Sequence, residues 1–262
     1  MSVTASTAMV ETPGSYPFQQ GVRAVLFCDF DGTLTPSDIG ATLFCKYSIG
    51  AVLENQLRGG EISALDYYQH ACAALSAEAT PEFIAEYALR IGFRPYAREL
   101  CTWCQQHGIG VAVVSDGLDA YIMPVLAAEG LEDIPVACNR LQWDLGKPRV
   151  SFPWASESCQ RNCPSPYPCA ACKRAVLLSW TPPGASILYL GEGASDFCPA
   201  LYADIVFASG ELAVWCSEQK IGFVPYNTLF DVRRSIEQLL RQRRLSPRYL
   251  PQQRRQQAWV EE

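Results

Sequence analysis

The chain has 262 residues, of which 49% are hydrophobic and 18% are charged, and its formal net charge is −6. This apolar content is enough for one large domain, or for a core domain with a smaller one attached. The negative charge gives no electrostatic support to nucleic-acid binding, and no apolar run approaches the roughly 18 residues of a membrane span.

Residues 1–20 carry neither a basic flank nor an apolar core, so they do not have the pattern of a secretory signal, and we expect a disordered leader there. The chain also holds 12 cysteines. Without a signal, so many cysteines favour thiols or metal ligands in a reducing compartment over disulfides. The sequence therefore predicts a cytoplasmic protein without membrane or nucleic-acid partners.

The first predicted strand, residues 22–28, ends directly before two aspartates, Asp29 and Asp31. Gly32 allows the backbone to turn, so both carboxylates can face one pocket at the carboxyl end of the strand. Two acids so close repel each other, which indicates a bound cation, and carboxylate oxygens suit Mg²⁺. Taken alone, the pair could also be a solvated turn after a core strand.

Residues 36–95 have helical patterns throughout. Ser63 and Asp66 form a capping-box pattern, Pro81 stands at the first position of a further helix, and Gly92 ends that helix. A helical stretch of about 60 residues is far longer than an ordinary connection between a strand and its neighbour. We therefore expect a separate helical cap over the site, formed by residues 36–95.

Helices and strands alternate in the rest of the chain. Helices are predicted over residues 96–107, 119–129 and 173–180, and strands over 110–115, 135–144, 149–153, 186–190, 204–208 and 222–224. The two strands at 135–144 and 149–153 form a hairpin. The alternation predicts an α/β fold, a Rossmann-like parallel sheet with helices on both faces.

The predicted core domain consists of residues 21–35 and 96–244, on either side of the cap. Residues 245–262 contain three arginines and many glutamines, and we expect a mobile tail there. A basic tail that binds an anion or a partner is the alternative.

Polar residues also follow other predicted strands, and a lysine opens the helix at 173–180. Four groups of residues, in this order, resemble the four motifs of the haloacid dehalogenase (HAD) superfamily: Asp29 with Asp31 and Thr33, Ser115 with Asp116 and Gly117, Lys173, and Glu192 with Asp196. The resemblance covers nearly all of residues 22–230. It implies a HAD core with a cap of the small C1 type.

The resemblance also implies the chemistry of a phosphatase. Asp29 would attack phosphorus and form an aspartyl-phosphate, and Asp31 would protonate the leaving alcohol and then activate water. Phosphatases of the superfamily carry aspartate at the position of Asp31, which favours phosphate-monoester hydrolysis over dehalogenation. The phosphoryl group would be bound by Thr33, Ser115, Asp116, Gly117 and Lys173.

The resemblance implies that Mg²⁺ is held by Asp29, Asp31, Glu192 and Asp196, with Asp31 using its carbonyl. The usual fourth motif begins with Gly-Asp, whereas this chain has Gly191-Glu192. Glutamate adds one methylene, so it could reach the metal with altered geometry. Alternatively, Glu192 is not a ligand, and Asp196 and waters hold the metal.

Finer features are similar to the methylthiopentenyl-phosphate phosphatases of methionine salvage, within the phosphoserine-phosphatase-like branch. These features include Asp38, Cys169-Ala170-Ala171-Cys172-Lys173 and Asp196-Phe197-Cys198-Pro199. Phosphocholine, phosphoethanolamine or phosphoserine phosphatases are the alternatives. Asp38 lies at the start of the cap, where it would bind a polar group of the substrate or act as a helix N-cap.

Four cysteines, Cys159, Cys163, Cys169 and Cys172, end in a Cys-x2-Cys half-site of the kind that binds zinc. A structural Zn²⁺ there would brace the loop that leads to Lys173. The alternative is a set of buried or partly paired thiols.

The sequence thus favours a Mg²⁺-dependent phosphatase that acts on a small-molecule phosphate ester as a monomer or homodimer. A non-catalytic ligand-binding protein of the same fold, its metal site weakened by Glu192, is the main alternative. A phosphotransferase or mutase with the same nucleophile is another.

Overall fold

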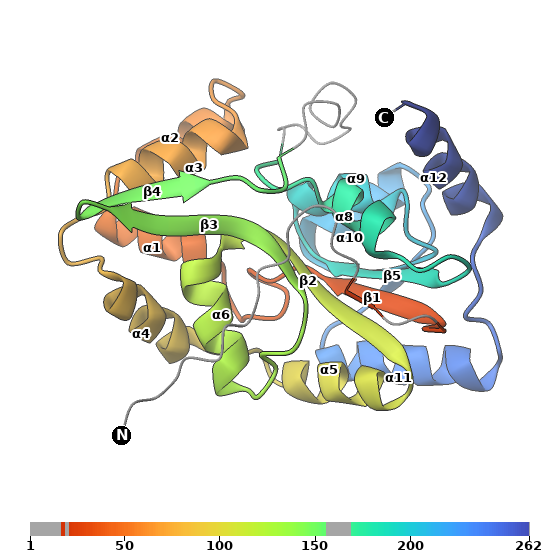
Figure 1. Cartoon of the computed structure of the whole chain (residues 1–262). Coiled ribbons are helices and arrows are strands. Elements are labelled where there is room, and N and C mark those ends of the chain that lie inside the picture. The colour runs from red at the N-terminus through yellow and green to blue at the C-terminus, as the bar shows by residue number, and fades with distance from the viewer. Residues whose placement is uncertain (1–16, 19–20, 156–168, 262) are drawn as a thin grey trace.

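The structure is a computed structural model that describes residues 17–18, 21–155 and 169–261. Its central feature is a sheet with the strand order β4-β3-β2-β1-β5-β6-β7 (Figure 1). The strands are β1 (Ala24–Cys28), β2 (Ile109–Leu118), β3 (Val136–Asp144), β4 (Lys147–Ser151), β5 (Ser186–Gly191), β6 (Ile205–Ala208) and β7 (Phe223–Pro225). Neighbouring strands are parallel except for the β3–β4 hairpin. The predicted α/β fold is confirmed.

Strand β1 lies in the middle of the sheet and is completely buried. Its continuous apolar sequence is typical of a parallel strand covered on both faces. Cys28 is in register with Val113 of β2 and with Leu190 of β5. The residues that follow these three positions therefore emerge at one edge of the sheet, and this register places the site.

Helices cover both faces of the sheet (Figure 1). One face packs against α5 (Ala97–Gln106), α6 (Asp119–Ala128) and α11 (Leu229–Arg241). The other packs against α8 (Lys173–Trp180), α9 (Phe197–Ala200) and α10 (Gly210–Glu218). Side chains of β1 alternate between the two cores: Leu26 belongs to the first cluster and Phe27 to the second.

Four helices occupy the stretch between β1 and α5: α1 (Ile39–Tyr47), α2 (Gly50–Arg58), α3 (Ala64–Ala73) and α4 (Pro81–Ile91). The predicted capping box of Ser63 and Asp66 begins α3, and Pro81 is the first residue of α4. Helix α3 packs beside β4, and α4 packs against α6. The apolar cluster on this face of the sheet continues into these helices through residues such as Leu43 and Tyr67.

The C-terminal residues differ from the mobile tail expected from the sequence, because they include helix α12 (Tyr249–Glu261). Asp204 directly precedes β6, and its carboxylate is buried. It accepts hydrogen bonds from the Arg248 N–H at 2.7 Å and from the Arg255 guanidinium at 3.2 Å. Arg255 also donates to the Tyr202 carbonyl. These arginines therefore attach the helix to the core.

Of the helices described, none combines the length and the apolar character needed to cross a membrane.

Candidate active site

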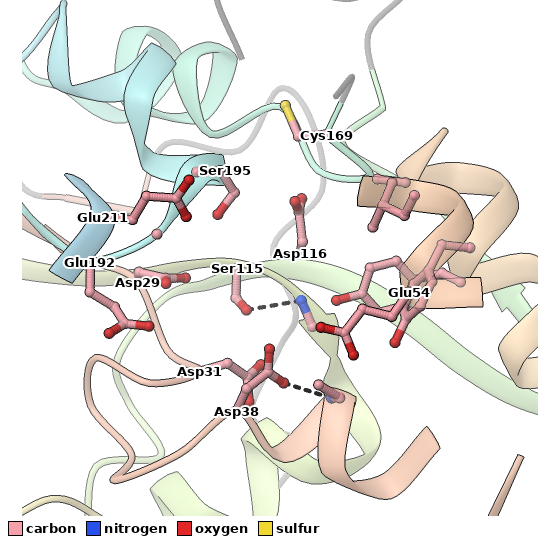
Figure 2. Close-up of a pocket in the computed structure, with 18 of the residues that line it drawn as sticks. Asp29, Asp31, Asp38, Glu54, Ser115, Asp116, Cys169, Glu192, Ser195 and Glu211 are labelled. Atoms are coloured by element: carbon pink, nitrogen blue, oxygen red, sulfur yellow. Dashed lines mark hydrogen bonds between the residues drawn. The ribbon is translucent and has the colours of Figure 1, made fainter. Parts of the chain in front are cut away.

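A cavity of about 310 Å³ lies at the carboxyl ends of β1, β2 and β5, next to helices α1 to α3 (Figure 2). Carboxylates dominate its lining: Asp29, Asp31, Asp38, Glu54, Asp116, Glu192 and Glu211. The other predicted site residues in the lining are Ser115, Gly117 and Cys169. Three further predicted site residues do not line the cavity and are buried in the protein: Thr33, Lys173 and Asp196.

Lys173 joins the first and fourth motifs. Its ammonium donates to Asp29 Oδ1 and to Asp196 Oδ1, both at 2.7 Å, and to Ser195 Oγ at 3.0 Å. The side chain is 1% exposed, so these three bonds use every proton of a buried charge. Burial opposes the charge of Lys173, but the carboxylates of Asp196 and Asp29 outweigh it and raise the pKa of the lysine.

Asp29 lines the cavity, and Lys173 bonds its Oδ1, so Oδ2 is the carboxylate oxygen that the lysine does not hold. Its backbone N–H donates to the Leu190 carbonyl at 2.9 Å, which fixes the residue at the end of β1 beside β5. Burial and the neighbouring charge of Asp196 raise the pKa of the Asp29 carboxyl, although Lys173 opposes the shift. A second cation near Asp29 would favour the ionised form that a nucleophile needs.

Asp196 has no free carboxylate oxygen. Oδ1 accepts from Lys173 and from the Tyr189 hydroxyl at 2.6 Å. Oδ2 accepts from the backbone N–H groups of Glu192 at 2.8 Å and Gly193 at 3.0 Å. The carboxylate is completely buried, and its hydrogen bonds hold Lys173 and the fourth-motif loop in place. Direct contact between Asp196 and a metal ion stays a prediction.

Glu192 reaches across to the loop that follows β1. Its carboxylate lies so close to Gly32 that a Cβ at that position would overlap Oε1, and Gly32 has a φ of +72°. The side chain of Glu192 thus occupies space that is open because Gly32 has no Cβ. Burial and the charge of Asp196 raise the pKa of the Glu192 carboxyl. Glu192 therefore extends toward the Asp29–Asp31 loop, as the prediction of a metal ligand requires.

No three His, Cys, Asp or Glu side chains within the described ranges converge closely enough to hold a metal ion by themselves. Mg²⁺, however, is commonly bound by only one or two carboxylates together with substrate phosphate and water. Asp29 and Glu192 line the same cavity as oxygen donors, and the pKa of each is raised, so a cation between them would be favoured. The donor set fits Mg²⁺.

The Asp31 carboxylate is held on both oxygens. Oδ1 accepts from the Ile39 backbone N–H at 2.8 Å, and Oδ2 accepts from the Tyr121 hydroxyl at 2.7 Å. Burial, followed by the charge of Asp38, raises the pKa of Asp31 to about 8. A carboxyl that keeps its proton near neutral pH can act as an acid toward a leaving group. Tyr121 has no counterpart among the residues predicted from the sequence.

Asp38 begins helix α1, where its Oδ1 accepts from the Ala41 N–H at 2.7 Å. This bears out the helix N-cap expected as one alternative. Asp38 also lines the cavity beside Asp31, so a cap role and contact with a substrate are compatible (Figure 2).

The second motif organises the end of β2. Ser115 Oγ accepts from the Gly117 N–H at 2.9 Å (Figure 2). Asp116 Oδ1 accepts from the Ala171 N–H at 2.6 Å, which ties β2 to the segment that leads to Lys173. The first motif differs: Thr33 Oγ1 is buried without a partner within the described chain, whereas Thr35, not predicted as a site residue, bonds Gly32 N and Phe30 O.

The described residues do not support the predicted zinc site. Cys159 and Cys163 lie outside them. Cys172 is the N-cap of α8, where its sulfur accepts from the Ala175 N–H at 3.4 Å.

A family model and sequence relatives match this chain. The family model described as "haloacid dehalogenase-like hydrolase" matches residues 26–198. A "2-hydroxy-3-keto-5-methylthiopentenyl-1-phosphate phosphatase" of Brevibacillus brevis is 27% identical over 83% of this chain and 96% of the relative. A protein of the same description from Geobacillus thermodenitrificans is 28% identical over 83% and 97%.

Solved structures show the same fold. A phospho-aspartyl intermediate analogue of phosphoserine phosphatase has a TM-score of 0.58 at 17% identity, covering 82% of this chain and 98% of the other. A substrate-bound phosphoserine phosphatase has a TM-score of 0.57 at 16% identity, over 81% and 98%. At these identities the similarity concerns the fold alone.

Proposed function

Because the chain belongs to the haloacid dehalogenase-like hydrolase family and is a phosphatase, we propose that it hydrolyses a small-molecule phosphate monoester through an aspartyl-phosphate on Asp29, with Mg²⁺ as cofactor. The observation that carries this proposal is the buried Lys173, which bonds Oδ1 of Asp29, a carboxylate that lines the cavity, and does not hold Oδ2. Helices α1 to α4, within residues 36–95, form the cap, and α1 to α3 line the cavity that would hold the ester.

In the first step, Asp29 Oδ2 attacks phosphorus. The new bond from Asp29 to phosphorus forms as the bond from phosphorus to the leaving alcohol oxygen breaks. Lys173 bonds Asp29, so its positive charge lies close to the transferring phosphoryl group, and the Ser115 hydroxyl in the cavity lining hydrogen-bonds a phosphoryl oxygen. The Thr33 hydroxyl, buried without a partner within the described chain, is a further hydrogen-bond donor for the phosphoryl group.

Asp31 transfers protons in both steps. Its carboxyl proton moves to the alcohol oxygen as that oxygen leaves, which produces a neutral alcohol. In the second step the Asp31 carboxylate takes a proton from water, the water oxygen binds phosphorus, and the bond from Asp29 to phosphorus breaks. Phosphate is released and both aspartates return to their starting states.

Asp29, Glu192 and the Asp31 carbonyl would hold the Mg²⁺ ion. When bound, the ion supplies positive charge to the phosphoryl oxygens and lowers the repulsion among the carboxylates of the cavity. Asp196 acts through Lys173 and through the backbone N–H groups of the fourth motif, not as a direct ligand.

The leading substrate is the methylthiopentenyl phosphate named in the relatives, which belongs to methionine salvage. The cap side of the cavity offers Leu57, Ala64 and the rings of Tyr67 and Tyr68 to an apolar methylthio group. A second candidate is a phosphate ester with a cationic head group, such as phosphocholine or phosphoethanolamine. The carboxylate of Asp38 on the same side of the cavity favours it, whereas Glu54 is already paired with Arg58 at 2.7 Å.

Phosphate release from the purified chain tests the proposal. The substrates are a methylthiopentenyl phosphate, phosphocholine, phosphoethanolamine and phosphoserine, each measured with and without Mg²⁺. We expect one of them to be hydrolysed well above the others, only with the metal, and Asp29→Asn to be inactive. The exposed Asp133→Asn is the matched control and should keep full activity. A wild-type protein inactive toward all four at every Mg²⁺ concentration would instead favour a non-catalytic binding protein.

A further inference from the structure

We propose that Tyr121 is a positioning residue for the proton transfer by Asp31, an inference that rests on the proposed function. The Tyr121 hydroxyl donates to Asp31 Oδ2 at 2.7 Å. The two residues are 90 positions apart in the chain, and they meet because β2 leads directly into α6, where Tyr121 is the third residue. The contact joins a core helix to the loop that carries both aspartates.

Burial shows why the hydroxyl matters. Tyr121 is completely buried, and its ring packs at a tilt against the ring of Phe30, with 6.3 Å between the centroids. A phenylalanine would fill the same apolar space without a polar atom to satisfy. A buried hydroxyl is costly unless it is hydrogen-bonded, and within the described chain Asp31 is its bonding partner. The Asp31 carboxylate is therefore the group that satisfies the buried Tyr121 hydroxyl.

Two glycines leave room for this contact. A Cβ at Gly117 would overlap the Tyr121 hydroxyl and would lie 2.7 Å from Asp31 Oδ2. A Cβ at Gly40, in α1, would lie 2.8 Å from the same hydroxyl. Since the ring end of a tyrosine is rigid, a side chain at either glycine would displace it. Gly117 in the second motif and Gly40 in α1 thus both leave space for the hydrogen bond between Tyr121 and Asp31.

The geometry fixes the plane of the Asp31 carboxylate. The Ile39 N–H holds Oδ1 at 2.8 Å and Tyr121 holds Oδ2, so rotation about the side-chain bond is restrained from both sides. Each oxygen keeps a second lone pair for the proton that is exchanged with the substrate. When that proton moves to the leaving alcohol oxygen and the bond to phosphorus breaks, the electron pair that held the proton stays on Asp31. Tyr121 then donates to the resulting carboxylate.

A role in positioning the acid predicts selectivity among leaving groups. Alkyl phosphates need a proton on the departing oxygen, whereas p-nitrophenyl phosphate releases a stabilised phenolate that does not. Tyr121→Phe should therefore slow formation of the phosphoryl-enzyme from an alkyl phosphate by between about 10- and 100-fold. For p-nitrophenyl phosphate, the same step should change much less.

The experiment is a rapid-quench measurement of the first turnover with both substrates. It compares the wild type, Tyr121→Phe and Tyr87→Phe, a control tyrosine that is half-buried in the cap. Gly40→Ala, which displaces the hydroxyl without removing it, should reproduce the selective loss, and it replaces Tyr121→Phe if that variant fails to fold. An equal loss with both substrates, or no loss with either, would overturn the inference. Wild-type protein that releases no phosphate from either substrate would refute the proposed function itself.

Discussion

Lys173→Met is the substitution with the largest expected effect, because it removes a buried cation that is bonded to two buried carboxylates. The bonds to Asp29 and Asp196 are both 2.7 Å long, and the lysine is 1% exposed. Hydrogen bonds to charged groups contribute about 1.5–3 kcal/mol each, and breaking a buried ion pair costs about 3–5 kcal/mol. We therefore expect the free energy of unfolding to fall by about 3–5 kcal/mol, together with loss of phosphatase activity.

Urea denaturation at neutral pH, with the single variants and the double variant Lys173→Met/Asp196→Asn, measures this effect. Without the lysine, Asp29 and Asp196 repel each other, so removing one charge should recover about 1–3 kcal/mol relative to additivity. The exposed Lys147→Met is the control and should change stability by less than about 0.5 kcal/mol. Additive effects within about 0.5 kcal/mol would refute the reasoning that these three charges form one unit.

Three further substitutions probe the loop, the tail and the cap. Gly32→Ala should lower stability by about 1–2 kcal/mol and reduce activity, because the new methyl group meets a positive φ and the Glu192 carboxylate; unchanged phosphate release would contradict this. Asp204→Asn should cost about 1–3 kcal/mol and expose α12 to proteolysis, whereas unaltered cleavage kinetics would argue against the docking described. Ser63→Ala should cost about 1 kcal/mol in thermal denaturation by removing the capping box with Asp66, and an unchanged melting temperature would speak against it.

Much of the fold could be predicted from the sequence, because its signals are local. The apolar runs that become β1, β2 and β5 are buried on both faces, and each is followed directly by polar residues. Parallel strands in register bring Asp29, Ser115 and Glu192 to one edge of the sheet. Helix starts such as that of α3 were also predictable, since a capping box lies within four consecutive residues.

The partners of the site residues could not be predicted, because they come from distant parts of the chain. Tyr121 bonds Asp31 across 90 positions, and Lys173 bonds Asp29 across 144. Nor did the composition of residues 245–262 reveal α12, whose attachment depends on a buried carboxylate about 50 positions earlier in the chain. The alternation of side chains along one strand contains no information about such pairs.

The most direct test of the account is the mass of the protein after acid quenching during turnover with Mg²⁺ and the best substrate of the panel. We predict that a fraction of the wild-type chain carries one added phosphoryl group, that peptide mapping places it on Asp29, and that Asp31→Asn accumulates more of it with an aryl phosphate because hydrolysis of the intermediate is slowed. A substrate that is turned over with no phosphoryl group on Asp29, or with the group on another residue, would contradict the central claim.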